Sequence, residues 1–357
     1  MPLLARLLAA PLVIDVRPGN LENLGSLLAD QRISTTGRVA VVVGATRSAG
    51  IVERLTPLLT GADWYVTADC SVDTAQRITD EIRGRGYEAV VGIGGGRVLD
   101  VAKFIAARAG LPMVAVATNL AHDGIASPIS ILDQTEGRSS YGVPLPIAVI
   151  VDLDEVQKAP RDMVAAGIGD VVSNLSAIAD WELSRVVTGE QIDGLAVAMA
   201  RTAGESLLHR QDSVEDSRFL VALTNALVLS GMAMSVSGTS RPCSGACHEI
   251  SHAIDALYPE ESGLHGFQVG VGATFASYLR GDAGLTAEIV TCLARHGLPV
   301  LPTQLGITND QFVAAVMHAP STRPGRFTIL EHLELTQPQV ESKLQAYLDT
   351  VASGDFG

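Results

Sequence analysis

Three histidines and one aspartate are the side chains of this sequence best suited to holding a metal ion. His248 and His252 lie four residues apart on an expected helix, which places both imidazoles on one face, one turn apart. His265 follows a loose loop, and Asp170 stands at the start of a long expected helix. Imidazoles from two elements and a carboxylate from a third can converge on a cation and leave one position open for a substrate. The spacing alone leaves open that the histidines are chance neighbours on a helix or cap its end.

A glycine-rich turn, GIGGGRVLD at residues 92–100, is the second feature with chemical potential. It follows an apolar run and opens an expected helix, the setting in which backbone amides and a helix N-terminus hold a pyrophosphate. The dinucleotide fingerprint G-x-G-x-x-G is incomplete, because Arg97 stands where the third glycine belongs. Since many strand-to-helix turns need glycine for geometry alone, phosphate binding and a purely structural turn are equally compatible with this segment.

A third motif, VATNLAHDGIASP at residues 116–128, begins at the expected end of a strand, where open α/β sheets bind ligands. Asp123 offers a carboxylate to substrate hydroxyls, and Ser127 offers a hydroxyl to a cofactor. The structural alternative is an Asx turn followed by a stop at Pro128, which the residues alone favour.

The elements that must position these motifs differ between the two halves of the chain. Short β-branched runs fill the first half, at residues 38–46, 64–69, 87–96, 112–118 and 146–154. They alternate with helical patterns at 74–86 and 97–110, which is typical of βαβ units around a parallel sheet. Apolar residues then recur every three to four positions and predict helices at 170–187, 194–210 and 216–235, with loose stretches at 256–264 and 318–326. We expect an α/β domain at residues 1–160 and an all-helical domain at 161–357.

Composition bounds the function further. The 357 residues suffice for about two domains, and 47% hydrophobic against 18% charged residues indicate a folded chain with a large core. A net charge of −14 repels nucleic-acid phosphates and anionic bilayers alike, so we expect no nucleic acid and no membrane as partner.

Cysteine spacing and the N-terminal segment indicate in which cellular compartment the protein would reside. The four cysteines show neither a disulfide pattern nor four-thiolate zinc spacing, which indicates a reducing, cytoplasmic setting. The apolar start MPLLARLLAAPLVIDV lacks a basic segment and runs into an expected strand, so we do not expect a signal peptide. No other stretch reaches the ~18 unbroken apolar residues of a membrane helix.

Taken together, GGGRVLDVAKFIA, ATNLAHDGIASP, GIGDVVSN and SGACHEISHAID with LHGFQVGVG resemble the sn-glycerol-1-phosphate dehydrogenases. That family belongs to the superfamily of glycerol dehydrogenase, iron-containing alcohol dehydrogenases and 3-dehydroquinate synthase. The resemblance covers about residues 38–275, and HDGIASP is its most discriminating part. It implies an NAD(P)-binding α/β domain with a parallel sheet (Rossmann-like, dehydroquinate synthase-like), followed by an all-α domain that binds metal and substrate.

The resemblance also implies roles for individual residues. Asp170, His248 and His265 would bind a divalent metal, zinc by expectation, with nickel or iron as alternatives. His252 would face the substrate, although the matching position is a ligand in glycerol and alcohol dehydrogenases of the superfamily. Asp123 and His252 are the implied catalytic residues, and both would contact the substrate together with Asp170. The implied contacts to NAD or NADP are Gly94, Gly95, Gly96, Arg97, Val98, Leu99, Asp100, Thr118, Asn119, Leu120, Ala121 and Ser127.

The implied reaction is the reversible reduction of dihydroxyacetone phosphate by NADH or NADPH to sn-glycerol 1-phosphate, a step of phospholipid metabolism. A metal would act as a Lewis acid on the ketone oxygen, and His252 would relay the proton directly or through water. Arg241 is a candidate partner for the phosphate. We expect a homo-oligomer, a dimer or larger.

Two positions depart from the family pattern. Cys247 and Phe267 stand where the family usually has glutamate, and the loss of two carboxylates changes hydrogen bonding around a metal. The substrate could therefore be another phosphorylated or polyol ketone of a specialised pathway. Two further functions stay open. One is a sugar-phosphate cyclase of the 3-dehydroquinate synthase type, which usually has glutamate at the position of Asp170 and several lysines. The other is a non-catalytic relative that binds nucleotide or metal.

Overall fold

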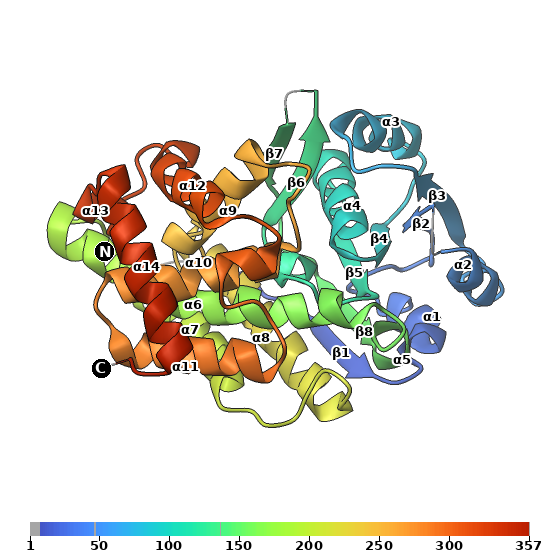
Figure 1. Cartoon of the computed structure of the whole chain (residues 1–357). Coiled ribbons are helices and arrows are strands. Elements are labelled where there is room, and N and C mark those ends of the chain that lie inside the picture. The colour runs from blue at the N-terminus through green and yellow to red at the C-terminus, as the bar shows by residue number, and fades with distance from the viewer. Residues whose placement is uncertain (1–7, 46–47, 136, 357) are drawn as a thin grey trace, which may run out of the picture. The chain divides into compact units, whose positions relative to one another are not determined.

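The computed structural model describes residues 8–45, 48–135 and 137–356 (Figure 1). The chain divides into two compact units, Met1–Pro160 and Arg161–Gly357, called here the N-terminal and the C-terminal unit. The expectation about a signal peptide falls partly on residues 1–7, which lie outside the described residues. All four cysteines are buried thiols.

A six-stranded, wholly parallel sheet forms the centre of the N-terminal unit, in the order β1-β8-β5-β4-β2-β3. Its strands are β1 (Val13–Arg17), β2 (Val39–Gly44), β3 (Ala62–Thr67), β4 (Ala89–Gly94), β5 (Met113–Ala117) and β8 (Ala148–Asp152). The four inner strands are buried along almost their whole length, which is why their sequences read as unbroken apolar runs. The predicted α/β fold class of this half is confirmed.

Helices cover both faces of this sheet. They are η1 (Asn20–Asn23), α1 (Leu24–Leu28), α2 (Ala49–Leu55), α3 (Val72–Ile82), α4 (Gly96–Ala109), η2 (Asp123–Ile125) and α5 (Leu153–Val156). Alternate valines of β2 pack with Leu24 and Leu55 on one face. On the other face, a Cβ atom at Gly92 of β4 would lie 2.6 Å from Cβ of Ala102 on α4. That glycine lets α4 lie close against the sheet.

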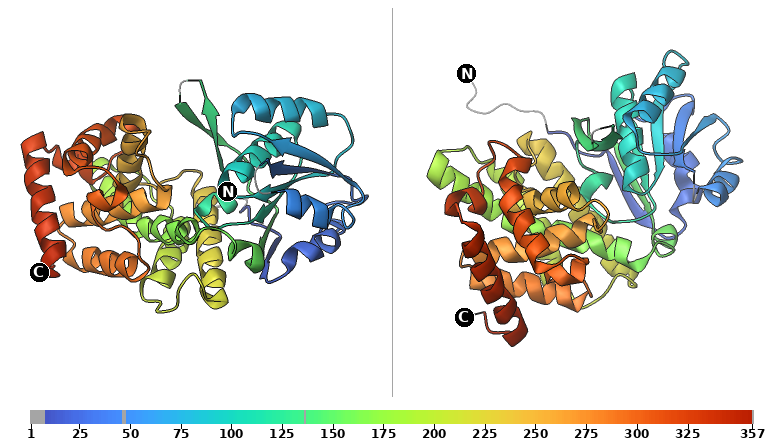
Figure 2. Two further views of the ribbon diagram at one scale, coloured as in Figure 1. Left: turned by 45° about the vertical axis from the view of Figure 1, so that its right-hand side comes forward. Right: turned by 45° about the horizontal axis from the view of Figure 1, so that its top comes forward.

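A separate antiparallel hairpin, β6 (Ile129–Gln134) and β7 (Gly137–Gly142), stands apart from the main sheet (Figure 2). The sequence did not predict it, because β7 reads GRSSYG and has no apolar alternation. The hairpin is anchored by the buried ammonium group of Lys103 on α4, which donates a hydrogen bond to the carbonyl oxygen of Ile129.

The described residues of the C-terminal unit form helices joined by loops, with no strand among them. Its elements are α6 (Arg161–Thr188), α7 (Gly194–Leu208), α8 (Ser217–Ser237), α9 (Ala246–Leu257), α10 (His265–Leu279), α11 (Ala283–Arg295), η3 (Pro302–Leu305), α12 (Asn309–Thr322), α13 (Ile329–Leu333) and α14 (Gln337–Ser353). The predicted all-α fold is confirmed. The loose stretch expected at 318–326 was wrong in its first part, since α12 continues through Pro320 to Thr322. Its apolar side chains, Phe312 and Val316 among them, hold that helix in the core.

Two helices of this unit, α6 and α8, are long and apolar enough to cross a membrane by length and composition alone. Their most apolar windows are nevertheless 83% and 61% buried inside the structure. α6 packs against α7, α9 and α10, and α8 packs against α7. The apolar composition of both is that of core helices.

Candidate active site

The crossing of α6 and α10 brings two predicted site residues together. A Cβ atom at Gly169 of α6 would overlap the carbonyl oxygen of Gly266 on α10, so only glycine permits this approach. Asp170 follows the first glycine and His265 precedes the second. The packing therefore sets their side chains beside each other, with 3.7 Å between Oδ1 of Asp170 and Nε2 of His265.

A second close approach, between α9 and α10, adds His248. A Cβ atom at Gly272 would lie 2.8 Å from the carbonyl oxygen of Cys247, the residue before this histidine. The ring centroids of His248 and His265 are 5.0 Å apart. One ligand atom each from Asp170, His248 and His265 lies within 4.8 Å of the other two. In the described part of the chain, the structure thus brings together the carboxylate and two of the three histidines singled out by the sequence.

Hydrogen bonds determine which nitrogen of His265 carries the proton. The carboxylate of Asp255 accepts a bond from Nε2 of Gln268 (3.1 Å), which turns the amide oxygen of Gln268 toward Ser251. Ser251 donates its single hydroxyl proton to that oxygen (2.7 Å) and so accepts a bond from Nδ1 of His265 (3.1 Å). Nε2 of His265 therefore presents a lone pair toward the carboxylate of Asp170, an arrangement suited to a cation between them.

His252 lies outside this group of three. Its ring centroid is 6.4 Å from that of His248, and its Nδ1 accepts a hydrogen bond from Nε of Arg323 (3.4 Å). Burial and the charge of Arg323 lower the pKa of His252 to about 3. The imidazole is neutral at neutral pH and carries its proton on Nε2.

The same electrostatics act on His248. Burial, followed by the neighbouring His265 and His252, holds the pKa of His248 well below its ordinary value. A neutral imidazole is the form in which histidine ligates metals.

In the N-terminal unit, the glycine turn and the HDGIASP segment meet at one edge of the sheet. β4 and β5 are neighbours in register, so the turn after β4 and the loop after β5 start side by side. A Cβ atom at Gly95 would lie 2.7 Å from Nδ2 of Asn119, and one at Gly96 would overlap the imidazole of His122. Glycine is required there because the second loop lies over the turn. No side chain caps the N-terminus of α4, which leaves its first amides available to a ligand.

Several residues of the predicted cofactor set point into the core. The side chains of Leu99 and Leu120 are fully buried, so only their backbone could reach a ligand. Val98 packs over the glycine turn. Arg97 is exposed, whereas Thr118 and Ala121 are half-buried.

Asp100 and Ser127 are connected by a lysine that the sequence reasoning missed. Nζ of Lys103 lies 2.8 Å from Oδ1 of Asp100 and 3.4 Å from Oγ of Ser127, and all three residues are buried. The available signal was a lysine on the apolar face of the helix in RVLDVAKFIA. Asp123 begins η2 in the same unit, but the side chain that caps η2 is His122, whose Nδ1 accepts a bond from the amide of Gly124 (3.0 Å).

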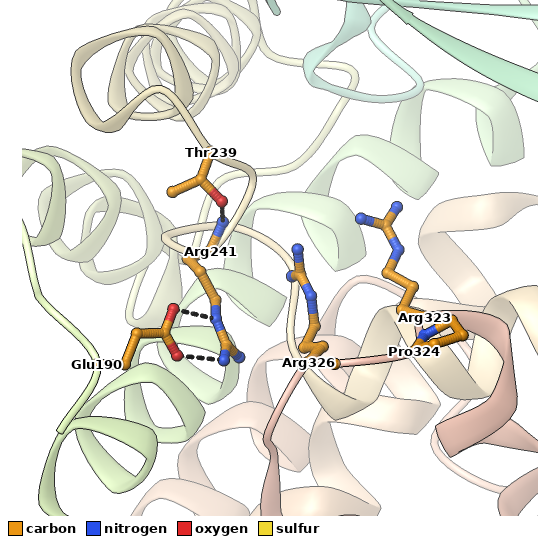
Figure 3. Close-up of a pocket in the computed structure, with 7 residues that line it drawn as sticks. Glu190, Thr239, Arg241, Arg323, Pro324 and Arg326 are labelled. Carbon is orange, nitrogen blue, oxygen red and sulfur yellow. Dashed lines mark hydrogen bonds and ion pairs between the residues drawn. The ribbon is translucent and has the colours of Figure 1, made fainter. Parts of the chain in front are cut away.

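Arg241, the sequence candidate for a phosphate, is buried and engaged by Glu190. Its Nε donates to the carboxylate at 2.8 Å, and Nη2 donates to the other oxygen (Figure 3). The positive charge of Arg241 is therefore already neutralised by Glu190, which does not favour Arg241 as the partner of a phosphate.

The chain is similar in sequence to known dehydrogenases. A family model described as iron-containing alcohol dehydrogenase matches residues 15–160. A glycerol-1-phosphate dehydrogenase (NAD(P)+) of Thermofilum pendens is 44% identical over 253 residues, covering 70% of this chain and 72% of that protein. One of Methanosarcina barkeri is 36% identical over 334 residues, covering 91% of this chain and 92% of that protein.

Solved structures show the same fold at low identity. A probable glycerol dehydrogenase from Sinorhizobium meliloti superposes with a TM-score of 0.75 at 24% identity, covering 98% of this chain and 99% of that one. Glycerol dehydrogenase from Schizosaccharomyces pombe gives 0.77 at 18% identity, covering 98% and 92%.

Proposed function

Because this chain belongs to the glycerol-1-phosphate dehydrogenase family, we propose that it reduces dihydroxyacetone phosphate with NADH or NADPH to sn-glycerol 1-phosphate. The observation that carries the proposal is the convergence of Asp170, His248 and His265 on one point of the C-terminal unit. The relatives cover 70% and 91% of this chain, and they favour this dehydrogenase over a sugar-phosphate cyclase or a non-catalytic protein. Supply of a phospholipid backbone in the cytoplasm, by a homodimer or larger oligomer, is part of the proposal.

The three converging side chains would hold one divalent cation. A buried carboxylate and two imidazoles suit zinc first, and nickel or iron as alternatives. Oδ1 of Asp170 and Nε2 of His265 are 3.7 Å apart, so both atoms could reach one cation between them. When bound, such a cation acts as a Lewis acid toward a ketone oxygen.

NAD(P) would bind the N-terminal unit at the turn from Gly94 to Arg97 and at the loop from Thr118 to Ala121. The uncapped amides of α4 fit a pyrophosphate, and the close-packed glycines hold this turn in place. The buried contacts of Lys103 with Asp100 and Ser127 would hold α4, which follows the turn, in position. The reduced nicotinamide supplies the hydride.

Water would supply the proton for the new alcohol, and the neutral imidazole of His252 would orient that water or the substrate oxygen with a hydrogen bond. Its Nδ1 is occupied by Arg323, so Nε2 is the atom that can donate to an oxygen. Asp123 is proposed to contact a substrate hydroxyl, so Asp123→Asn should lower turnover while leaving the affinity for NAD(P)H unchanged.

A direct assay tests the proposal. Purified protein is stripped with a chelator, reloaded separately with zinc, nickel or iron, and mixed with dihydroxyacetone phosphate and NADH or NADPH. We expect net cofactor oxidation with at least one metal, and oxidation of sn-glycerol 1-phosphate, but not of its mirror image, in the reverse direction. Consumption of a sugar phosphate without net cofactor oxidation would point to a cyclase. Turnover of dihydroxyacetone but not of its phosphate would show a shifted substrate.

A further inference from the structure

Two arginines that the sequence reasoning did not single out lie in the loop between α12 and α13. Gly325 between them has a φ of 85°, a left-handed conformation that favours glycine. The turn leaves the side chains of Arg323 and Arg326 extended alongside each other (Figure 3). This part of the loop is therefore shaped to present two guanidinium groups together.

Neutral groups alone hold these guanidinium groups in place. Nη1 of Arg323 and Nη2 of Arg326 donate to the same hydroxyl oxygen, Oγ of Ser240, at 3.1 and 2.9 Å. Nη1 of Arg326 donates to the carbonyl oxygen of Ser244. Within the described residues, neither arginine takes part in an ion pair.

Among the described residues, no carboxylate therefore contacts either guanidinium group to neutralise its charge. Glu190, the one carboxylate lining the neighbouring cavity, is held by Arg241 through two hydrogen bonds. Burial, together with the charges of Arg323 and Arg241, lowers the pKa of Arg326 to about 10. Positive charge that is partly withdrawn from water is costly unless an anion compensates it.

A cavity of about 330 Å³ lies beside these side chains and is lined by both of them. Arg323 also reaches the catalytic candidates, since its Nε donates to Nδ1 of His252 at 3.4 Å. His252 in turn lies one helical turn from His248 of the metal group. Within the C-terminal unit, His252 therefore connects the two groups, since it contacts Arg323 of the cavity and its ring centroid lies 6.4 Å from that of His248 in the metal group.

We propose that Arg323 and Arg326 bind the phosphate group of the substrate and thereby fix its ketone beside His252 and the metal group. The planar donors of guanidinium match phosphate oxygens in paired hydrogen bonds. Anchoring the phosphate turns binding energy into orientation of the reacting carbon. This inference rests on the proposed function, which supplies a phosphorylated ketone.

Steady-state kinetics of single variants test the site. Arg323→Gln and Arg326→Gln should each lower kcat/KM for dihydroxyacetone phosphate about 10- to 100-fold, mainly through KM, because each removes a charge-assisted bond. In Arg326→Gln, which leaves the contact between Arg323 and His252 in place, the weak reduction of dihydroxyacetone, which lacks the phosphate, should fall far less than that of its phosphate. Arg326→Lys keeps the positive charge but lacks the paired donors of guanidinium. Its kcat/KM for dihydroxyacetone phosphate should lie between those of wild type and Arg326→Gln. Arg201→Gln, which breaks an exposed pair with Glu182, is the matched control and should leave both rates unchanged.

A binding measurement separates this inference from the proposed function. Calorimetric titration of the full-length protein with inorganic phosphate and with sn-glycerol 1-phosphate should show affinities about 10- to 100-fold weaker in Arg326→Gln. If Arg326→Gln fails to fold by circular dichroism, Arg326→Lys takes its place. Wild type that binds phosphate through these arginines but reduces no ketone phosphate would overturn the function and support the site.

Two results would overturn the inference while leaving the function in place. One is unchanged phosphate affinity and unchanged KM for dihydroxyacetone phosphate in both glutamine variants. The other is a raised KM for NADPH alone, with NADH and substrate unaffected, which would assign the arginines to the cofactor's extra phosphate.

Discussion

Gly169 of α6 and Gly266 of α10 face each other where the two helices cross, at a separation that admits no Cβ atom on Gly169. Their chain neighbours are Asp170 and His265, the two candidate ligands separated by 3.7 Å. The distance between these side chains is therefore a consequence of backbone packing. It depends on the absence of two methyl groups.

Replacing Gly266 with alanine tests this dependence. The added Cβ would overlap the carbonyl oxygen of Ala166 and force α10 away from α6. We expect loss of bound metal and a decrease of about 1–3 kcal/mol in the free energy of unfolding, from metal analysis and urea denaturation. Gly263→Ala, at a nearby position with no atom within 4 Å, is the control and should retain both. Wild-type metal affinity in Gly266→Ala would show that the crossing does not set the site.

Ser251→Ala tests the hydrogen bonds that orient His265. Without the hydroxyl, Nδ1 of His265 loses its hydrogen bond to Ser251, and the imidazole is no longer oriented by it. Metal affinity should fall about 10- to 100-fold, measured by competition with a chromophoric chelator. Ser206→Ala removes a comparable helix hydroxyl, bonded to the carbonyl of Ala203, and should not change the affinity. Equal metal affinities for Ser251→Ala and Ser206→Ala would show that Ser251 does not orient a metal ligand.

Gly96→Ala tests the cofactor turn. Its Cβ would overlap the imidazole of His122, so the loop after β5 must move away from the turn. Fluorescence titration should show NADH affinity reduced about 10-fold or more, with bound metal unaffected. Gly50→Ala, on α2 with open space around it, is the control and should raise stability slightly. Unchanged NADH affinity in Gly96→Ala would separate the turn from cofactor binding.

Glu249, beside His248, is buried as a neutral acid. Burial raises its pKa to about 9. The hydrogen bonds agree with this protonation. The hydroxyl of Thr328 has one proton and lies 2.6 Å from Oε2 of Glu331 and 3.2 Å from Oε2 of Glu249. When Thr328 donates to the nearer oxygen, Glu249 must supply the proton of the longer bond.

The pH dependence of stability follows from this raised pKa. The contribution of protonated Glu249 is fully present below the ordinary value of 4.5 and is lost as pH rises toward about 9. Glu249→Gln keeps a neutral side chain at every pH, so its Tm relative to wild type should increase across that interval. Differential scanning calorimetry of the metal-loaded proteins measures it, with the exposed Glu260→Gln as control. A Tm difference that does not vary with pH would mean that Glu249 is ionised in the folded protein.

Much of the fold could be predicted because its signals are local. Unbroken apolar strands alternating with helices predicted the parallel sheet, and three-to-four-residue periodicity predicted α6, α7 and α8. The β6–β7 hairpin was not predicted because β7, GRSSYG, lacks apolar alternation, and the hairpin is held by a tertiary contact to Lys103. Pro320 suggested a loop, but packing of the apolar face of α12 keeps the helix intact.

The candidate site was predictable only in part. The residues alone predicted four candidate ligands, and the resemblance selected Asp170, His248 and His265 from them as the metal set. The groups that orient them, Ser251 and Gln268, come from different helices, and no spacing rule connects them. Arg323 was missed for the same reason, since its relation to His252 spans 71 residues of sequence.

Metal stoichiometry of His248→Ala and His265→Ala tests the central claim most directly. Wild type and the exposed-site control His209→Ala, loaded with zinc and freed of excess by gel filtration, should carry one ion per chain by inductively coupled plasma mass spectrometry. Each ligand variant should carry about none and lack dehydrogenase activity, whereas His252→Asn should retain the ion and lose turnover. One ion per chain in both His248→Ala and His265→Ala would contradict the account.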